Sequence, residues 1–155
     1  MTELDRNDST NLFEFAFSDD GLVVITDLRD DAEPIDGQLF IPSEIAGRRV
    51  VEISNRAFSG ADALKRVVIS RGIKRIGSMA FWRCVALEEV VLPPDLEALG
   101  VMAFAGCSSL LRIAIPSSVR ELRDGVFSGC ATSLKLSSRT VLSRSRKELF
   151  TSAPP

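Results

Sequence analysis

The sequence predicts an α/β solenoid of about four 23-residue repeats, with short parallel strands on the concave side and a β-hairpin cap at its N-terminal end. Three observations support this prediction. Pairs of a small residue and a phenylalanine recur every 23 residues, cysteines recur at the same step, and aliphatic columns keep one register between them. A unit of this length cannot bury its own apolar face, so we expect the units to stack.

The N-terminal hairpin is predicted from residues 12–26. The stretch LFEFAF places Phe13, Phe15 and Phe17 on one strand face, and SDDG at 18–21 is a turn signal before LVVIT. We expect this hairpin to cap the N-terminal end of the stack. The acidic stretch TDLRDDAEPIDG at 26–37 then connects it to the repeats.

The repeat itself occupies residues 39–138 and is defined by seven columns in one register. Its columns include Ala57-Phe58, Ala80-Phe81, Ala103-Phe104 and Val126-Phe127; Cys84, Cys107 and Cys130, with Ala61 in the first unit; and Leu64, Leu87 and Leu110. Seven matching columns over about four units exclude chance.

Each unit is expected to hold a strand followed by a short helix. The segment from Leu87 to Leu92 alternates as a strand does, and the prolines Pro42, Pro93 and Pro116 would stop it. A second apolar pair, such as Leu96 and Leu99, would then turn the chain back. The expected helix has N-caps at Asn55, Ser78 and Asp124 and ends at Gly60, Gly106 and Gly129.

The C-terminal residues 139–155 form the third predicted region, after the cap and connector at 1–38 and the repeats. The stretch ATSLKL, which follows Cys130, is expected to break the repeat register. Ser145 and Glu148 suggest a capping box for a short helix that ends near Phe150, and TSAPP is expected to be disordered. A weak cap of this kind would leave an edge open to self-association.

The pattern I-P-x-x-V-x-x-I-G-x-x-A-F-x-x-C-x-x-L-x-x-V resembles the BspA-like leucine-rich repeats. Units 69–91, with Ser70 in place of proline, and 92–114 match it well, and the first unit carries five extra residues between Ile45 and Ile53. The resemblance covers about residues 39–137. It implies a leucine-rich-repeat solenoid that acts as a non-enzymatic recognition scaffold. Family members are often cell-surface adhesins.

Composition sets further limits on function. The chain has 155 residues, enough for one domain with a real core, and it lacks histidine, the commonest general base and metal ligand. The polar, acidic N-terminus has no signal-peptide pattern, so we expect a cytoplasmic protein, with the cell surface open for a processed or excised fragment. Residues 1–40 hold eleven carboxylates and two arginines, a net charge of −9, and residues 41–138 carry +4.

No cofactor, metal or catalytic site is predicted. The three cysteines share one apolar column and are expected to be a packed thiol ladder, with a disulfide between neighbouring units as an alternative. The carboxylates of the acidic connector do not follow a calcium-loop spacing and are expected to be solvated. We do not expect nucleic-acid binding, because the basic side chains are interleaved with acidic ones and lack an aromatic platform. Those basic side chains are Arg48, Arg49, Arg71, Lys74, Arg75, Arg120 and Arg123.

The outward positions of the predicted sheet are the leading candidates for partner binding. Strand alternation turns them toward the concave face, which suits a protein or peptide partner rather than a small molecule. Two other readings stay open: an adhesin domain whose export signal is missing, and a structural self-assembling module. The outward residues are Phe40, Arg66, Val68, Glu89, Val91, Arg112 and Lys135, with Gln38 and Ala114 completing the columns.

Residues 79–84, MAFWRC, contain the single tryptophan of the chain. Phe81 and Cys84 fill repeat columns, but Trp82 and Arg83 stand where other units have a small residue and a glycine. If the left-handed conformation persists at Arg83, it costs on the order of 1 kcal/mol relative to glycine. The pair is either a tolerated surface feature or a secondary contact, since tryptophan and arginine are enriched in hot spots.

Overall fold

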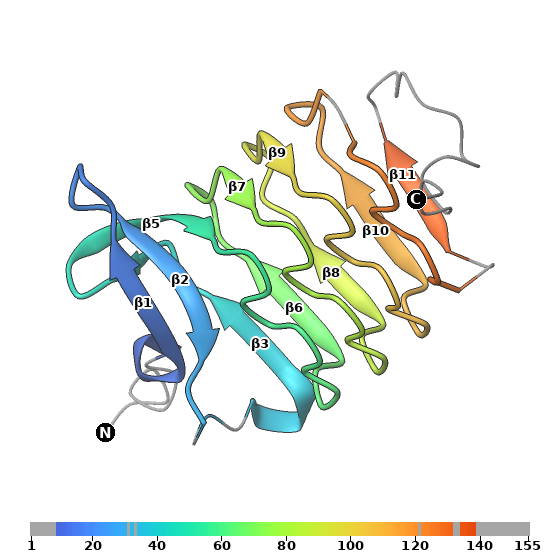
Figure 1. Ribbon diagram of the computed structural model, residues 1–155, viewed down its shortest axis with the longest axis horizontal. Coiled ribbons are helices and arrows are strands. Elements are labelled where there is room, and N and C mark those ends of the chain that lie inside the picture. Colours follow the sequence, from blue (N-terminus) through green and yellow to red (C-terminus); the bar gives the residue numbers. More distant parts are fainter. Residues whose placement is uncertain (1–8, 31, 33, 121, 132–133, 139–155) are drawn as a thin grey trace.

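A computed structural model describes residues 9–30, 32, 34–120, 122–131 and 134–138. Within them two sheets run side by side along the long axis of the molecule, and the chain passes from one to the other as it winds (Figure 1). This confirms a solenoid with parallel strands. The elements in chain order are η2 (Ser9–Leu12), β1 (Phe13–Phe17), β2 (Val23–Leu28), η3 (Ile35–Gly37), β3 (Gln38–Ile41), β4 (Glu44–Ile45), β5 (Arg48–Ile53), β6 (Arg66–Ile69), β7 (Arg75–Ile76), β8 (Glu89–Val91), β9 (Ala98–Leu99), β10 (Arg112–Ile115) and β11 (Lys135–Ser138).

The first sheet, called sheet B here, has the strand order β11-β10-β8-β6-β3 and is parallel throughout. Strands β3 and β10 end immediately before Pro42 and Pro116, as the prolines predict, because proline cannot donate to a sheet ladder. The pairing of Arg112 with Lys135 keeps the 23-residue step. The predicted break of register after Cys130 is therefore wrong for β11.

The second sheet, called sheet A, was not predicted from the sequence. It has the order β1-β2-β5-β7-β9, and a single bridge from Leu99 to Leu122 extends it. The apolar pairs expected only to turn the chain back, such as Leu96 and Leu99, are buried, and Leu99 lies in β9 of this sheet. Strands β7 and β9 are each only two residues long, so their sequences are too short to show the alternation that identifies a strand.

The hairpin β1–β2 forms as predicted, with β2 pairing parallel to β5, so the hairpin extends sheet A. Phe13 is buried, and its ring contacts that of Phe58 edge-on, with centroids 6.1 Å apart. Phe17, at the far end of β1, is 56% exposed. Phe13 therefore covers the N-terminal end of the core, which gives the cap its physical basis.

The extra residues of the first unit form a second small hairpin. Strand β4 pairs antiparallel with the start of β5, Glu44 opposite Arg49 and Ile45 opposite Arg48. Ala46 and Gly47 between them have φ values of 52° and 71°. Two consecutive residues with positive φ are typical of the tight turn whose twist matches that of a two-stranded hairpin.

The third side of each coil consists of turns, so the predicted short helices are wrong for the described residues. Arg56, Met79 and Met102 have φ between 54° and 61°, a left-handed conformation that interrupts a helix. Alternate amides instead bond to the next coil: the Phe81 N–H donates to the Ala103 carbonyl at 2.8 Å. The predicted N-cap Asn55 also reaches across, because its Oδ1 accepts the Ser78 N–H at 2.8 Å.

A ladder of phenylalanines fills the interior beside these turns. Phe58, Phe81, Phe104 and Phe127 are buried, and successive ring centroids lie 5.1, 5.2 and 6.1 Å apart. Ring contacts of this kind add about 0.5–1.5 kcal/mol per pair beyond the burial of apolar area. The 23-residue recurrence of phenylalanine is therefore the sequence trace of one continuous core column.

Candidate functional site

The outer face of sheet B carries two rows of side chains that cross its strands. Register pairs Gln38 with Arg66, Arg66 with Glu89, Glu89 with Arg112 and Arg112 with Lys135. Gln38 and these four charged residues together are called the charged row. They have this common orientation because successive strand residues point to opposite faces, so that each outward residue is flanked by a buried one.

The second row lies two residues further along the strands and is apolar. Phe40 is opposite Val68, and Val68 is opposite Val91. Ala114 occupies the same register position in β10, since its predecessor Ile113 pairs with Val90. Phe40 is 43% exposed and Val91 38% exposed, so the apolar row is accessible to a partner.

Arg66 and Glu89 of the charged row form an ion pair with each other, whereas Arg112 and Lys135 do not form one with any described residue. The Arg66 Nε donates to the Glu89 Oε2 at 2.7 Å, and both side chains are partly exposed. Within the part of the chain that the structure describes, neither Arg112 nor Lys135 has a carboxylate within ion-pair distance. The positive charge of the row is therefore concentrated toward β10 and β11.

Two hollows lie along this face. The larger, of about 520 Å³, has both apolar and charged walls, and the smaller, of about 240 Å³, lies at the start of the strands. The larger hollow is lined by Glu89, Val90, Val91, Leu92, Arg112, Ile113, Ala114 and Lys135. The smaller is lined by Asp36, Gln38, Lys65, Arg66, Glu88, Glu89, Leu111 and Arg112.

Trp82 and Arg83 lie on the turns between β7 and β8, outside sheet B, so the structure does not join them to the two rows. Arg83 has a φ of 57°, and its guanidinium carbon lies 5.3 Å from the Trp82 ring centroid. Trp82 is 38% exposed. The left-handed conformation expected for this column thus persists at an arginine, and the pair forms a small cation–π surface of its own.

The cysteines form a ladder of free thiols. The Sγ atoms of Cys84, Cys107 and Cys130 each donate to the carbonyl of the phenylalanine 26 residues earlier, all at 3.1 Å. The Cys84 thiol and burial raise the pKa of Cys107 far above its ordinary value, and burial raises the pKa of Cys130 to about 12. Packing was predicted for these residues, but the thiol–carbonyl bonds were not.

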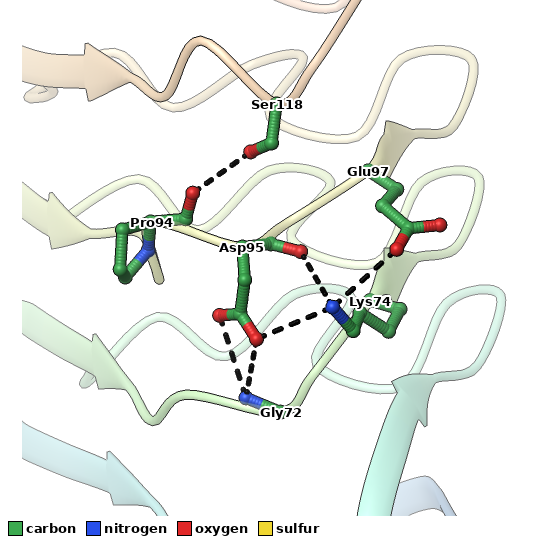
Figure 2. A network of polar contacts seen from close by, with 6 residues as sticks. All are labelled: Gly72, Lys74, Pro94, Asp95, Glu97 and Ser118. Atoms are coloured by element: carbon green, nitrogen blue, oxygen red, sulfur yellow. Dashed lines mark hydrogen bonds and ion pairs between the residues drawn. The ribbon is translucent and has the colours of Figure 1, made fainter.

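A polar network at the turns between the two sheets was also missed (Figure 2). The Asp95 carboxylate accepts the Gly72 amide of the preceding coil at 3.1 Å and lies 3.3 Å from the Lys74 Nζ. Lys74 also lies 3.4 Å from Glu97. Lys74 precedes Asp95 by 21 residues and Glu97 by 23, and neither column keeps one residue type from unit to unit, so the repeat pattern gave no signal for this network.

The pKa shifts in this network favour the charged form of both Asp95 and Lys74. Burial acts to raise the pKa of Asp95, but the Gly72 amide and the Lys74 ammonium outweigh it and hold that pKa below its ordinary value. The hydrogen bond to Asp95 raises the pKa of Lys74. Both groups are therefore stabilised in their charged forms, which holds one coil to the next.

Two further basic residues named in the sequence have separate partners within the described part of the chain. Arg75 lies 3.7 Å from Glu52, and Arg48 donates to the Gly21 carbonyl and lies over the Phe17 ring. No group of three possible metal-ligating side chains occurs among the described residues, which leave out Asp31 and Glu33 of the acidic connector. None of the described helices is long and apolar enough to cross a membrane.

Comparison with protein families gives one match that covers most of the chain. Residues 38–153 match the family described as "BspA type Leucine rich repeat region (6 copies)". This range includes all five strands of sheet B. No curated protein sequence matches the chain at a significant level.

Solved structures with the same fold come from several bacteria. The leucine-rich repeat protein TpLRR of Treponema pallidum is 29% identical, with a TM-score of 0.71 over 82% of this chain and 62% of its own. A leucine-rich repeat protein from Bacteroides capillosus is 24% identical, with a TM-score of 0.74 over 83% of this chain and 95% of its own. A leucine-rich cell surface protein from Faecalibacterium prausnitzii is 23% identical, with a TM-score of 0.68 over 91% and 41%.

Proposed function

This chain belongs to the BspA-type leucine-rich repeat family, and on that premise we propose that it is a non-catalytic scaffold that binds a protein or peptide through the outer face of sheet B. The family and the fold are typical of proteins that act by interaction rather than catalysis. The observation that carries the proposal is the pairing of a charged row with an exposed apolar row on one face of sheet B. Solenoids generally bind partners on an extended surface of this kind.

The size of this face favours a macromolecular partner. Strands lie about 4.8 Å apart, so five strands span on the order of 20 Å. Its hollows are only partly enclosed, and their walls mix apolar side chains with charged ones. Small-molecule sites instead enclose most of their ligand.

Charge-reversal variants of sheet B and of sheet A test which of the two sheets binds the partner. The tagged chain and its variants are used to capture partners from native lysate. We expect R66E/E89R/R112E to lose the captured partner, because it inverts the charged row while preserving an opposite pair at 66 and 89. The control E52R/R75E inverts the ion pair on sheet A without changing the net charge and should retain the partner. Equal capture by the wild type and both variants would refute the proposal.

The cell surface is a second candidate setting. The Faecalibacterium prausnitzii protein that shares this fold is described as a cell surface protein, and the chain spans less than half of it. The cytoplasmic location expected from the sequence stays a prediction. Fractionation of the source cells, followed by detection of the chain in the cytosolic and surface fractions, decides between the two.

A further inference from the structure

We propose that the half of this face formed by β8, β10 and β11 binds an extended acidic peptide in which an acidic and an apolar residue are separated by one position. This inference rests on the proposed function and deepens it by naming the chemistry of the partner. It follows from three features of the larger hollow: its charge, its apolar floor and the spacing between them.

The charge of the hollow is the first feature. Arg112 and Lys135 are neighbours across β10 and β11, both exposed, and the described part of the chain supplies neither with an ion pair. Glu89 also lines the hollow, but its Oε2 is held by Arg66 at 2.7 Å. The hollow therefore has an excess of positive charge, which an acidic partner would neutralise.

The apolar floor is the second feature. Val91 is 38% exposed, Ala114 is exposed and Leu92 is half-buried, and all three line the same hollow of about 520 Å³. An apolar side chain placed there removes these surfaces from water, which favours binding. A purely acidic ligand would leave this area uncovered, so the partner must also carry an apolar group.

The spacing of the two rows is the third feature. Arg112 and Ala114 are two residues apart on β10, which in a strand is about 6.6 Å along its length. In an extended peptide the side chains at positions i and i+2 lie on one face and are separated by the same distance. A peptide that runs along the strands can therefore place its acidic group at Arg112 and Lys135 and its apolar group over Val91 and Ala114.

The test uses a labelled peptide of three tandem Glu-Ser-Leu-Ser units and two matched peptides with Gln or Lys in place of Glu. Binding to the full chain is measured by fluorescence anisotropy at low and at high salt. We expect the Glu peptide to bind most tightly and to weaken with salt. R112Q/K135Q should weaken binding about tenfold, the loss expected for two partly exposed charge contacts.

Two variants control for effects away from the hollow. R71Q/R120Q removes the same charge from exposed residues in the turns that follow β6 and β10, and it should leave the affinity within about twofold. V91S removes an exposed apolar contact without changing charge and should also weaken binding. Thermal unfolding of each variant shows whether the fold is kept, which the exposure of these side chains predicts.

The inference is overturned if the Gln or Lys peptide binds as tightly as the Glu peptide, or if R112Q/K135Q keeps the wild-type affinity. Such a result leaves the proposed function standing as long as R66E/E89R/R112E still loses the captured partner. If R66E/E89R/R112E still captures the partner while the Glu peptide binds at Arg112 and Lys135, the peptide site is supported and the proposed function of the outer face of sheet B is refuted.

Discussion

The thiol of Cys107 donates a hydrogen bond of 3.1 Å to the carbonyl of Phe81 in the preceding coil, and the same bond recurs one coil earlier and one coil later. A thiol is small enough to fit beside the phenylalanine ladder and polar enough to satisfy a carbonyl that is shielded from water. The cysteine column therefore links each coil to the preceding one through hydrogen bonds. It also explains why Ala61 is acceptable in the first unit, where no earlier coil of the repeat offers that carbonyl.

The first prediction concerns the reactivity of these thiols. Cys107 is fully buried, and burial by itself raises the pKa of its thiol even without Cys84, so little thiolate exists near pH 8 and the reagent cannot reach it. A C84S/C130S variant, which leaves Cys107 alone, should react with Ellman's reagent only after unfolding in guanidinium. Rapid reaction of the folded variant at pH 8 would contradict the packing described here.

The second prediction concerns Gly100. A Cβ at this position would lie 2.4 Å from the Ser78 backbone nitrogen, so the coils would have to move apart. We expect G100A to lower the free energy of unfolding by more than about 2 kcal/mol in urea titration. The control G47A, where a Cβ meets nothing within 4 Å and only the φ of 71° is unfavourable, should lose about 1 kcal/mol. Equal losses in G100A and G47A would show that the close approach of Gly100 to the Ser78 backbone does not require a glycine.

The third prediction concerns Arg83. Glycine adopts a φ of 57° without a steric penalty, so R83G should gain up to about 1 kcal/mol in the free energy of unfolding. The gain is reduced because the Arg83 Cγ packs beside Gly106 and its guanidinium lies over Trp82. R83A loses the same side-chain contacts as R83G but keeps the steric penalty of the left-handed backbone. Urea titration of both variants therefore separates the backbone strain from the loss of contacts. A large loss in both would show that the pair is structural.

The fourth prediction is a pH dependence centred on Asp95. Its pKa in the folded chain is depressed, so its contribution to stability is complete above the unfolded pKa of about 3.9 and is lost as pH falls through the folded value. D95N should be less stable than the wild type at pH 7, by less than about 1 kcal/mol because the group is partly exposed. The difference should vanish at low pH. A difference that stays constant down to pH 2 would contradict the assignment.

The sequence was sufficient for the repeat, the hairpin and the two rows of sheet B. Each depends on a regular signal: the 23-residue columns, the alternation of Phe13, Phe15 and Phe17, and the outward positions of longer strands. Sheet A escaped prediction because β7 and β9 hold two residues each, too few to show a period. The turns were mistaken for helices because Asn55 and Gly60 also suit helix ends, whereas the structure uses Asn55 to bond the next coil.

The central claim, that sheet B is the binding face, is tested most directly by photocrosslinking. A photoreactive phenylalanine analogue is placed at Val91 on sheet B or at Ala98 on sheet A, both of which are exposed. Each variant is irradiated in native lysate of the source cells. We predict a discrete crosslinked partner from position 91 and none from position 98. The same partner from position 98 alone, or equally from both, would contradict the account.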